Sequence, residues 1–144
     1  MRTIQRLALL LLALSLAASV AMAAPAAIDD PDKYAAEAMR LLAKGDMTAL
    51  AKMVTDSIGK PDSAEGLKNA LGMIAGKTID YNDKVIDNTF GKGLRQIVYY
   101  SFIDNFGFVY YRFNFKMSSK GWILANFNFK TETNELFPKD FVDR

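Results

Sequence analysis

The chain has 144 residues, with no cysteine, no histidine, 18 basic and 16 acidic side chains, and a formal net charge of +2. Without Cys it can form no disulfide and has no thiol nucleophile. Without His it has no imidazole base, no Ser-His-Asp arrangement and no His-based metal site. No pattern in the chain indicates a cofactor, a metal site or a set of catalytic residues.

The first 23 residues have the three parts of a secretory signal peptide. A basic start ends at Arg6, an apolar run of 14 residues spans 7–20, and residues 21–23 form an A-x-A cleavage pattern. The run is too short for a membrane span. We expect cleavage after Ala23 and export to a bacterial periplasm or the extracellular space, with no membrane span in the product.

The exported part is expected to be neutral and to form one domain. Loss of Arg2 and Arg6 lowers the 18 basic residues to 16, equal to the number of acidic residues. This balance argues against nucleic acid or an anionic membrane surface as a partner. We expect a linker at 24–30, a domain at 31–131 and a C-terminal tail at 132–144.

The first helical pattern follows the linker. Asp30 is the expected N-cap, Pro31 occupies the first helical position, and Gly45 stops a helix that runs to Lys44. The acidic cluster at 29–32 has two readings, a cation site or a helix start, and a helix start needs no ion.

Two more helices are expected before the sheet. Asp46 caps the second, which ends at Gly59, and residues 62–65 resemble a capping box with Asp in place of Ser or Thr. The third helix ends at Gly76. Each has apolar residues at helical spacing, which indicates one buried face.

Three long strands rich in aromatic and β-branched residues dominate the second half of the chain, at 94–103, 108–117 and 122–131. The segments 105–107 and 119–121 each end in Gly and predict three-residue hairpin loops with a left-handed glycine. These loops place Ser101 opposite Tyr111, Tyr99 opposite Phe113 and Phe113 opposite Phe127. All odd-numbered positions then share one face.

The segment before these strands has a less regular pattern. We expect a short strand at 79–81 and a longer one at 84–89. The following turn, residues 91–93, has room for two or three loop residues. A two-residue loop and a three-residue loop would turn opposite faces of this strand inward, and the sequence pattern does not distinguish between them.

The odd-numbered face is the expected core, packed against the helices. Five residues are candidates for lining a ligand pocket on this side: Tyr81, Asp83, Tyr99, Ser101 and Tyr111. The alternative is that Tyr99 and Tyr111 are core aromatics with the hydroxyl at the rim. Ser101 either leaves space for a ligand or fills a tight spot under a helix.

The even-numbered face is the expected interface. It carries Leu94, Val98, Tyr100, Phe102, Phe108, Tyr110, Trp122 and Leu124, with Arg112, Asn114, Asn126 and Asn128. A face turned to solvent would be more charged. Arg112 is expected between Tyr100 and Asn128. We expect this face to be covered by the tail, another protein or a second copy, of which a two-fold homodimer is the simplest; the alternative is a sheet face that nothing covers.

Three helices followed by a meander predict an α+β fold. The sequence Ala-Lys-Gly-Asp at 43–46, the aromatic sheet and the Gly121-Trp122 strand start resemble the nuclear transport factor 2-like, or cystatin-like, superfamily over 31–131. That resemblance implies three helices on a strongly curved, cone-shaped antiparallel sheet. It also implies either a small enzyme with a pocket or a non-catalytic binding domain, often dimeric through the outer sheet face.

Two functions follow from these observations. The first is an exported, non-catalytic domain that binds a protein partner or small ligand, which the missing His and Cys favour. The second is a small isomerase- or hydrolase-like enzyme that uses Tyr and carboxylate groups.

Overall fold

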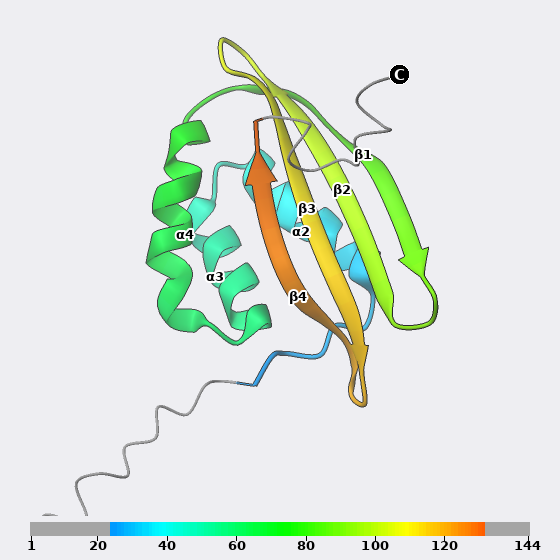
Figure 1. Cartoon of the computed structure of the whole chain (residues 1–144). Helices are drawn as coiled ribbons and strands as arrows, with labels where there is room; N and C mark the ends of the chain where they lie inside the picture. Colours follow the sequence, from blue (N-terminus) through cyan, green and yellow to red (C-terminus); the bar gives the residue numbers. More distant parts are fainter. Residues whose placement is uncertain (1–23, 132–144) are drawn as a thin grey trace, which may run out of the picture.

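The computed structural model describes residues 24–131, so the signal peptide predicted at 1–23 and the tail at 132–144 lie outside the described residues. The described part is α+β, as the sequence predicts. Three α-helices precede an open antiparallel sheet of four strands in the order β1-β2-β3-β4 (Figure 1). Each strand therefore pairs with its neighbour in the chain.

The helices begin and end close to their predicted limits. They are α2 (Pro31–Ala43), α3 (Met47–Ile58) and α4 (Ala64–Leu71), with 3₁₀ turns at Pro61–Ser63 and Gly72–Ile74. The Asp30 carboxylate accepts from two first-turn N–H groups, and Asp46 accepts from Ala49 N at 3.0 Å, which confirms both caps. The capping box is wrong, because Asp62 lies in the 3₁₀ turn and the N-cap Ser63 makes no side-chain bond.

The strands are β1 (Ile79–Phe90), β2 (Leu94–Ile103), β3 (Gly107–Ser118) and β4 (Gly121–Lys130). β1 is one strand, not the predicted two. Two bulges, at Asp80 and Val85, interrupt its pairing with β2, and each reverses the alternation of its side chains. The following loop has three residues, 91–93, with Phe90 opposite Leu94.

The predicted register between β2 and β3 is wrong by two residues. Tyr111 faces Tyr99, and Ser101 faces Val109. The loop lies one residue earlier than predicted because Asn105 also has a positive φ of 58°, beside Gly107 at 99°. An even shift keeps every side chain on its predicted face. The predicted positive φ of Gly107 is confirmed, although the register that was predicted with it is wrong.

The β3–β4 register is right at one end and wrong at the other. Phe113 faces Phe127 as predicted, but a bulge at Ala125 places Phe115 opposite Leu124. The loop has two residues, 119–120, rather than three, and Gly121 keeps its predicted positive φ at 114°. Leu124 and Trp122 therefore lie on the helix-facing side, so their assignment to the outer face is wrong.

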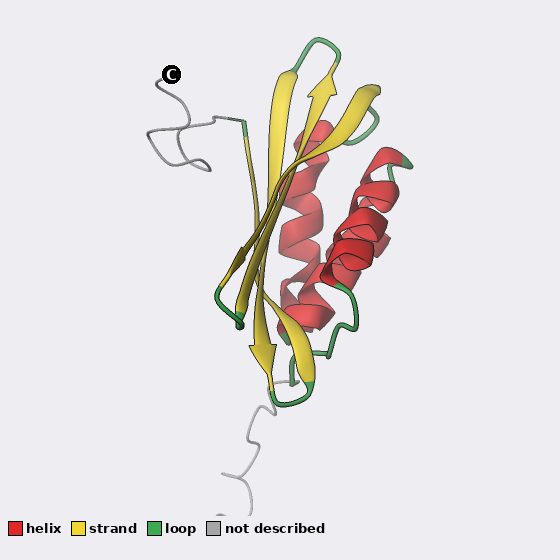
Figure 2. Ribbon diagram, turned by 90° about the vertical axis from the view of Figure 1, so that its right-hand side faces the viewer, coloured by secondary structure: helices red, strands yellow, loops and turns green. Residues whose placement is uncertain are grey.

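All the helices lie on one side of the sheet (Figure 2). We call the helix-covered side the inner face and the other the outer face. The core between helices and inner face is fully buried at Leu42, Leu50, Phe113 and Phe115. The expected linker adds Ile28, whose N–H donates to Trp122 O at 2.7 Å. Between residues 24 and 131 no helix has the length and apolarity needed to cross a bilayer.

Candidate functional site

Five aromatic rings from three strands form a contact network on the outer face. We call it the outer aromatic cluster; its members are Tyr81, Tyr100, Phe102, Phe108 and Tyr110. Tyr81 stacks on Phe102 with ring centroids 5.9 Å apart, and Phe108 meets Phe102 edge-on at 5.1 Å. Tyr100 contacts Tyr81, Phe108 and Tyr110 at 5.5–6.4 Å. Period-2 alternation explains the arrangement, because even positions of β2 and β3 point to the same side.

The rings of this cluster retain exposed surface although they contact one another. Phe108 is 42% exposed and Tyr81 is 41% exposed. Exposed apolar side chains that stand singly are common, but a contiguous patch of them marks an interaction surface. Partial desolvation, and then the charge of Asp83, raise the pKa of Tyr100, whose hydroxyl donates weakly to that carboxylate at 3.5 Å. The cluster is therefore neutral and apolar with polar hydroxyl edges.

Arg112 forms the polar centre beside the cluster. It faces Asn128 as predicted, but on its other side it faces Val98 and not Tyr100. Val98 is fully buried under Ile86 and Tyr110. Arg112 Nε is buried and has no hydrogen-bond partner among the described residues. A guanidinium donor in this position favours a carboxylate or carbonyl oxygen as its ligand.

Asparagine side chains complete this polar region. Asn114 faces Asn126, as predicted, and Asn114 Oδ1 accepts from Gln96 Nε2 at 3.1 Å. Asn128 donates to Asn126 along β4. The predicted interface residues are therefore together on one face, with the rings at one end and the Arg112–Asn region towards the other.

The predicted pocket residues are divided between the two faces. Tyr99, Ser101 and Tyr111 lie on the inner face, but Tyr81 lies on the outer face, because the bulge at Asp80 turns it there. Asp83 is also on the outer face, opposite Tyr100, so its assignment to the pocket is wrong. Ser101 and Tyr111 are both fully buried. They are sealed within the core, not placed at the mouth of a pocket.

A short row of buried polar atoms crosses the inner face. Asn82 faces Ser101, and Asn82 Oδ1, Ser101 Oγ and Tyr111 Oη have no hydrogen-bond partner within residues 24–131. Burial raises the pKa of Tyr111, and the nearby Ser101 hydroxyl opposes this in part. Asn82 also donates to Met39 O of α2 at 3.3 Å. No local pattern in the sequence indicates Asn82, because its face depends on the bulges in β1.

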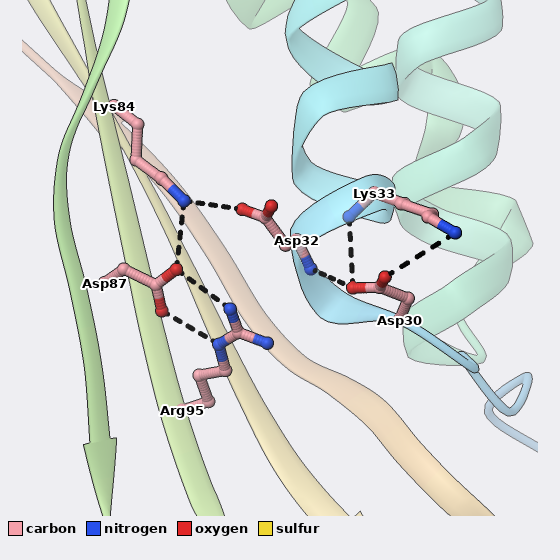
Figure 3. Close-up of polar contacts among 6 residues, drawn as sticks. All are labelled: Asp30, Asp32, Lys33, Lys84, Asp87 and Arg95. Carbon is pink, nitrogen blue, oxygen red and sulfur yellow. Dashed lines mark hydrogen bonds and ion pairs between the residues drawn. The ribbon is translucent and has the colours of Figure 1, made fainter.

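An ion-pair cluster joins α2 to the β1–β2 edge (Figure 3). Lys84 Nζ lies 2.8 Å from Asp32 Oδ1 and 3.0 Å from Asp87 Oδ2, and Arg95 binds Asp87 with two bonds of 2.8 Å. The bonds to Arg95 lower the pKa of Asp87 to about 2, and both carboxylates raise that of Lys84. These groups stay ionised near neutral pH, so they fit a structural role better than proton transfer.

Tyr99 lies beside this cluster, opposite Lys84. Burial, and then the charge of Asp32, raise the pKa of its hydroxyl, so the tyrosinate form is disfavoured near neutral pH. Asp30 caps the helix as predicted, whereas Asp32 in the first turn accepts from Lys84 of β1. Within 24–131 no three acidic residues come together as metal ligands.

A shallow pocket of about 190 Å³ lies between α3 and α4. It is small beside the 300–1,000 Å³ or so of typical ligand sites. Two ion pairs line it, Lys52 with Asp56 and Lys68 with Glu65. Its charged groups are therefore already satisfied, and it is separate from the predicted inner pocket.

No protein-family model matches this sequence. No curated protein matches it either. The resemblance to the nuclear transport factor 2-like superfamily therefore stays a prediction. The outer face, with its exposed rings and Arg112, is the candidate binding site.

Proposed function

We propose that this chain is an exported, non-catalytic domain that binds a protein partner through its outer sheet face. The observation that carries the proposal is the outer aromatic cluster, five rings in contact with one another on a side of the sheet that no helix within residues 24–131 covers. Export rests on the signal-peptide pattern at 1–23. A cone-shaped sheet of the nuclear transport factor 2-like type is part of the same proposal.

The composition of the face supports a protein partner. Aromatic side chains and Arg are enriched in the buried centres of protein interfaces, whereas Lys, Glu and Asp are depleted there. Tyr and Trp or Arg residues also account for most of the binding energy in such centres. The outer aromatic cluster with Arg112 has this composition. Asp83 and Lys130 lie at its margins on the edge strands, and Lys116 lies near the far end of β3.

The enzyme alternative has weaker support. Its candidate tyrosines on the inner face, Tyr99 and Tyr111, both have a raised pKa, and Tyr111 is sealed in the core. Asp87, a carboxylate of the ion-pair cluster beside Tyr99, has a pKa far below neutral. A general acid or base works best with a pKa near the operating pH.

A second copy of the chain is the partner we propose. A two-fold pairing needs only one self-complementary patch, and Asp83 on the edge strand β1 has the opposite charge to Arg112 on β3. Two-fold symmetry brings each Asp83 towards the partner's basic edge. Arg112 thereby keeps polar partners when water leaves.

Light scattering on the wild type and on Phe108→Glu tests the homodimer. We expect a dimer at tens of micromolar, roughly the range in which weak pairing appears, and a monomer for the variant. Met73→Glu is the matched control, because Met73 is 52% exposed and lies away from the sheet, before β1. A monomer at that concentration, both for the wild type and for protein that ends at Thr131, rejects the homodimer.

A further inference from the structure

We infer that the C-terminal segment 132–144 folds back onto the outer aromatic cluster of its own chain and competes with the partner for that surface. This rests on the proposed function in one respect, since it takes the outer face as the binding surface. The proposed occupant of the cluster is the tail, which would bind through its apolar residues Leu136, Phe137 and Phe141. The surface would then be masked in the isolated chain and uncovered when a partner displaces the tail.

The position at which the tail leaves the sheet supports this inference. β4 ends at Lys130, which faces Tyr110, a member of the outer aromatic cluster. The next residues therefore start at the edge of the rings and not at the helices. An extended chain spans about 3.3–3.6 Å per residue, so Phe137 can lie about 20 Å beyond Lys130. Neighbouring strands are about 4.8 Å apart, so this reaches past β1.

Charge complementarity favours the same occupant. The outer-face charges of β3 and β4 are all basic: Arg112, Lys116 and Lys130. The tail has four acidic residues, Glu132, Glu135, Asp140 and Asp143, against two basic ones, Lys139 and Arg144. It therefore brings an excess of negative charge to a positive strip. A second copy brings the same positive strip, so only its Asp83 edge is complementary.

The unpaired donor on this face adds a specific site for a carboxylate. Arg112 Nε is buried with no hydrogen-bond partner among the described residues. A buried donor of this kind is costly until an acceptor reaches it. Arg112 lies two positions along β3 from Tyr110, so a tail that crosses the rings passes within reach of it.

Tethering makes the tail a strong competitor even if its contacts are weak. A segment joined by a short flexible link has an effective concentration in the millimolar range at its site. A second copy present at micromolar concentration must overcome this difference. Removal of the tail is therefore expected to strengthen pairing through the outer face at least tenfold.

A spin label tests the contact directly. The chain has no Cys, so Val142→Cys carries the label at one position only. We expect at least a twofold intensity loss of the amide signals of Tyr100, Phe108 and Tyr110, and none at Lys52 on α3. A mixture of spin-labelled unenriched protein with unlabelled ¹⁵N protein should show no loss. An equal loss in the mixture, which reports only contacts between chains, or no loss on the sheet, overturns the inference.

Two double variants of the spin-labelled protein test whether the intensity loss depends on the apolar residues of the tail. Phe137→Ser with Phe141→Ser should abolish the intensity loss (signal broadening), whereas Thr133→Ala with Asn134→Ala should leave it unchanged. Equal broadening in both pairs overturns the role of the apolar tail residues.

Light scattering on protein that ends at Thr131 separates the inference from the proposed function. Broadening together with a monomeric truncated protein supports the masking tail and rejects the homodimer. A dimer of unchanged strength after truncation supports the homodimer and rejects the masking tail.

Discussion

The two faces of the sheet are both rich in aromatic residues, yet their environments are opposite. On the inner face Phe113 and Phe115 are at most 1% exposed beneath the helices, whereas on the outer face Phe108 is 42% exposed. The inner face is mainly Phe and aliphatic residues, and the outer face mixes rings with Asn and Arg112. Aromatic content therefore identifies the strands, and the accompanying polar residues distinguish the outer face from the core face.

The largest expected effect separates the two faces by stability. Phe113→Ala removes a fully buried ring and should lower the free energy of unfolding by about 3–5 kcal/mol. Phe108→Ala should cost less than about 1 kcal/mol, because that ring is already partly hydrated. Urea denaturation measures both. Similar costs for the two variants would mean that the outer face is covered as tightly as the core.

A turn substitution tests the strand geometry that assigns residues to faces. Gly107 has a φ of 99°, so Gly107→Val should destabilise the domain by about 1–2 kcal/mol. The control is Gly93→Val, since Gly93 lacks a positive φ and an added Cβ there meets nothing within 4 Å. Thermal unfolding of both compares them. A Gly93 variant as unstable as the Gly107 variant would contradict the turn assignment.

The two faces should also respond differently to loss of a tyrosine hydroxyl. Tyr111 Oη is buried without a partner, so Tyr111→Phe should stabilise the domain by about 1 kcal/mol. Tyr100→Phe, on the outer face, should change stability by no more than about 0.5 kcal/mol. Destabilisation by Tyr111→Phe would show that the hydroxyl has a partner, and denaturation midpoints decide the matter.

The smallest expected effect concerns two carboxylates. The folded pKa of Asp87 is about 2 against an ordinary value of 3.8, so its carboxylate contributes stability above about pH 4 that is lost as the pH falls towards 2. Solvent screens this edge of the sheet, so Asp87→Asn should cost about 1 kcal/mol or less at pH 7.

The pH dependence of the unfolding free energy should differ between a carboxylate on the inner face, Asp87, and one on the outer face, Asp83. The difference in unfolding free energy between the wild type and Asp87→Asn should close between about pH 4 and pH 2. Asp83→Asn, on the outer face, should change stability by no more than about 0.5 kcal/mol at pH 7. A constant difference for Asp87→Asn across this pH range would contradict the role of the Arg95–Asp87 pair.

Local chemistry in the sequence determined the helices and the existence of the strands. Asp30 and Asp46 cap where predicted because a short carboxylate reaches the free N–H groups of the next turn. Gly45 and Gly59 end helices with a φ of 74° and 79° because other residues avoid that conformation. Period-2 alternation placed Phe113 and Ser101 inside, and Phe108 and Arg112 outside.

Only the tertiary structure decided the bulges and the exact pairing. One extra residue at Asp80 turned Tyr81 outward, and one at Ala125 turned Leu124 inward. A bulge reverses every side chain beyond it, so a local pattern with two adjacent apolar residues fits either face equally well. Which face a strand residue takes depends on which side chains the helices cover. Burial of Leu124 and Trp122 against the helices removes apolar surface from water. The helices are far away in the sequence, so no local pattern in the strand contains this information.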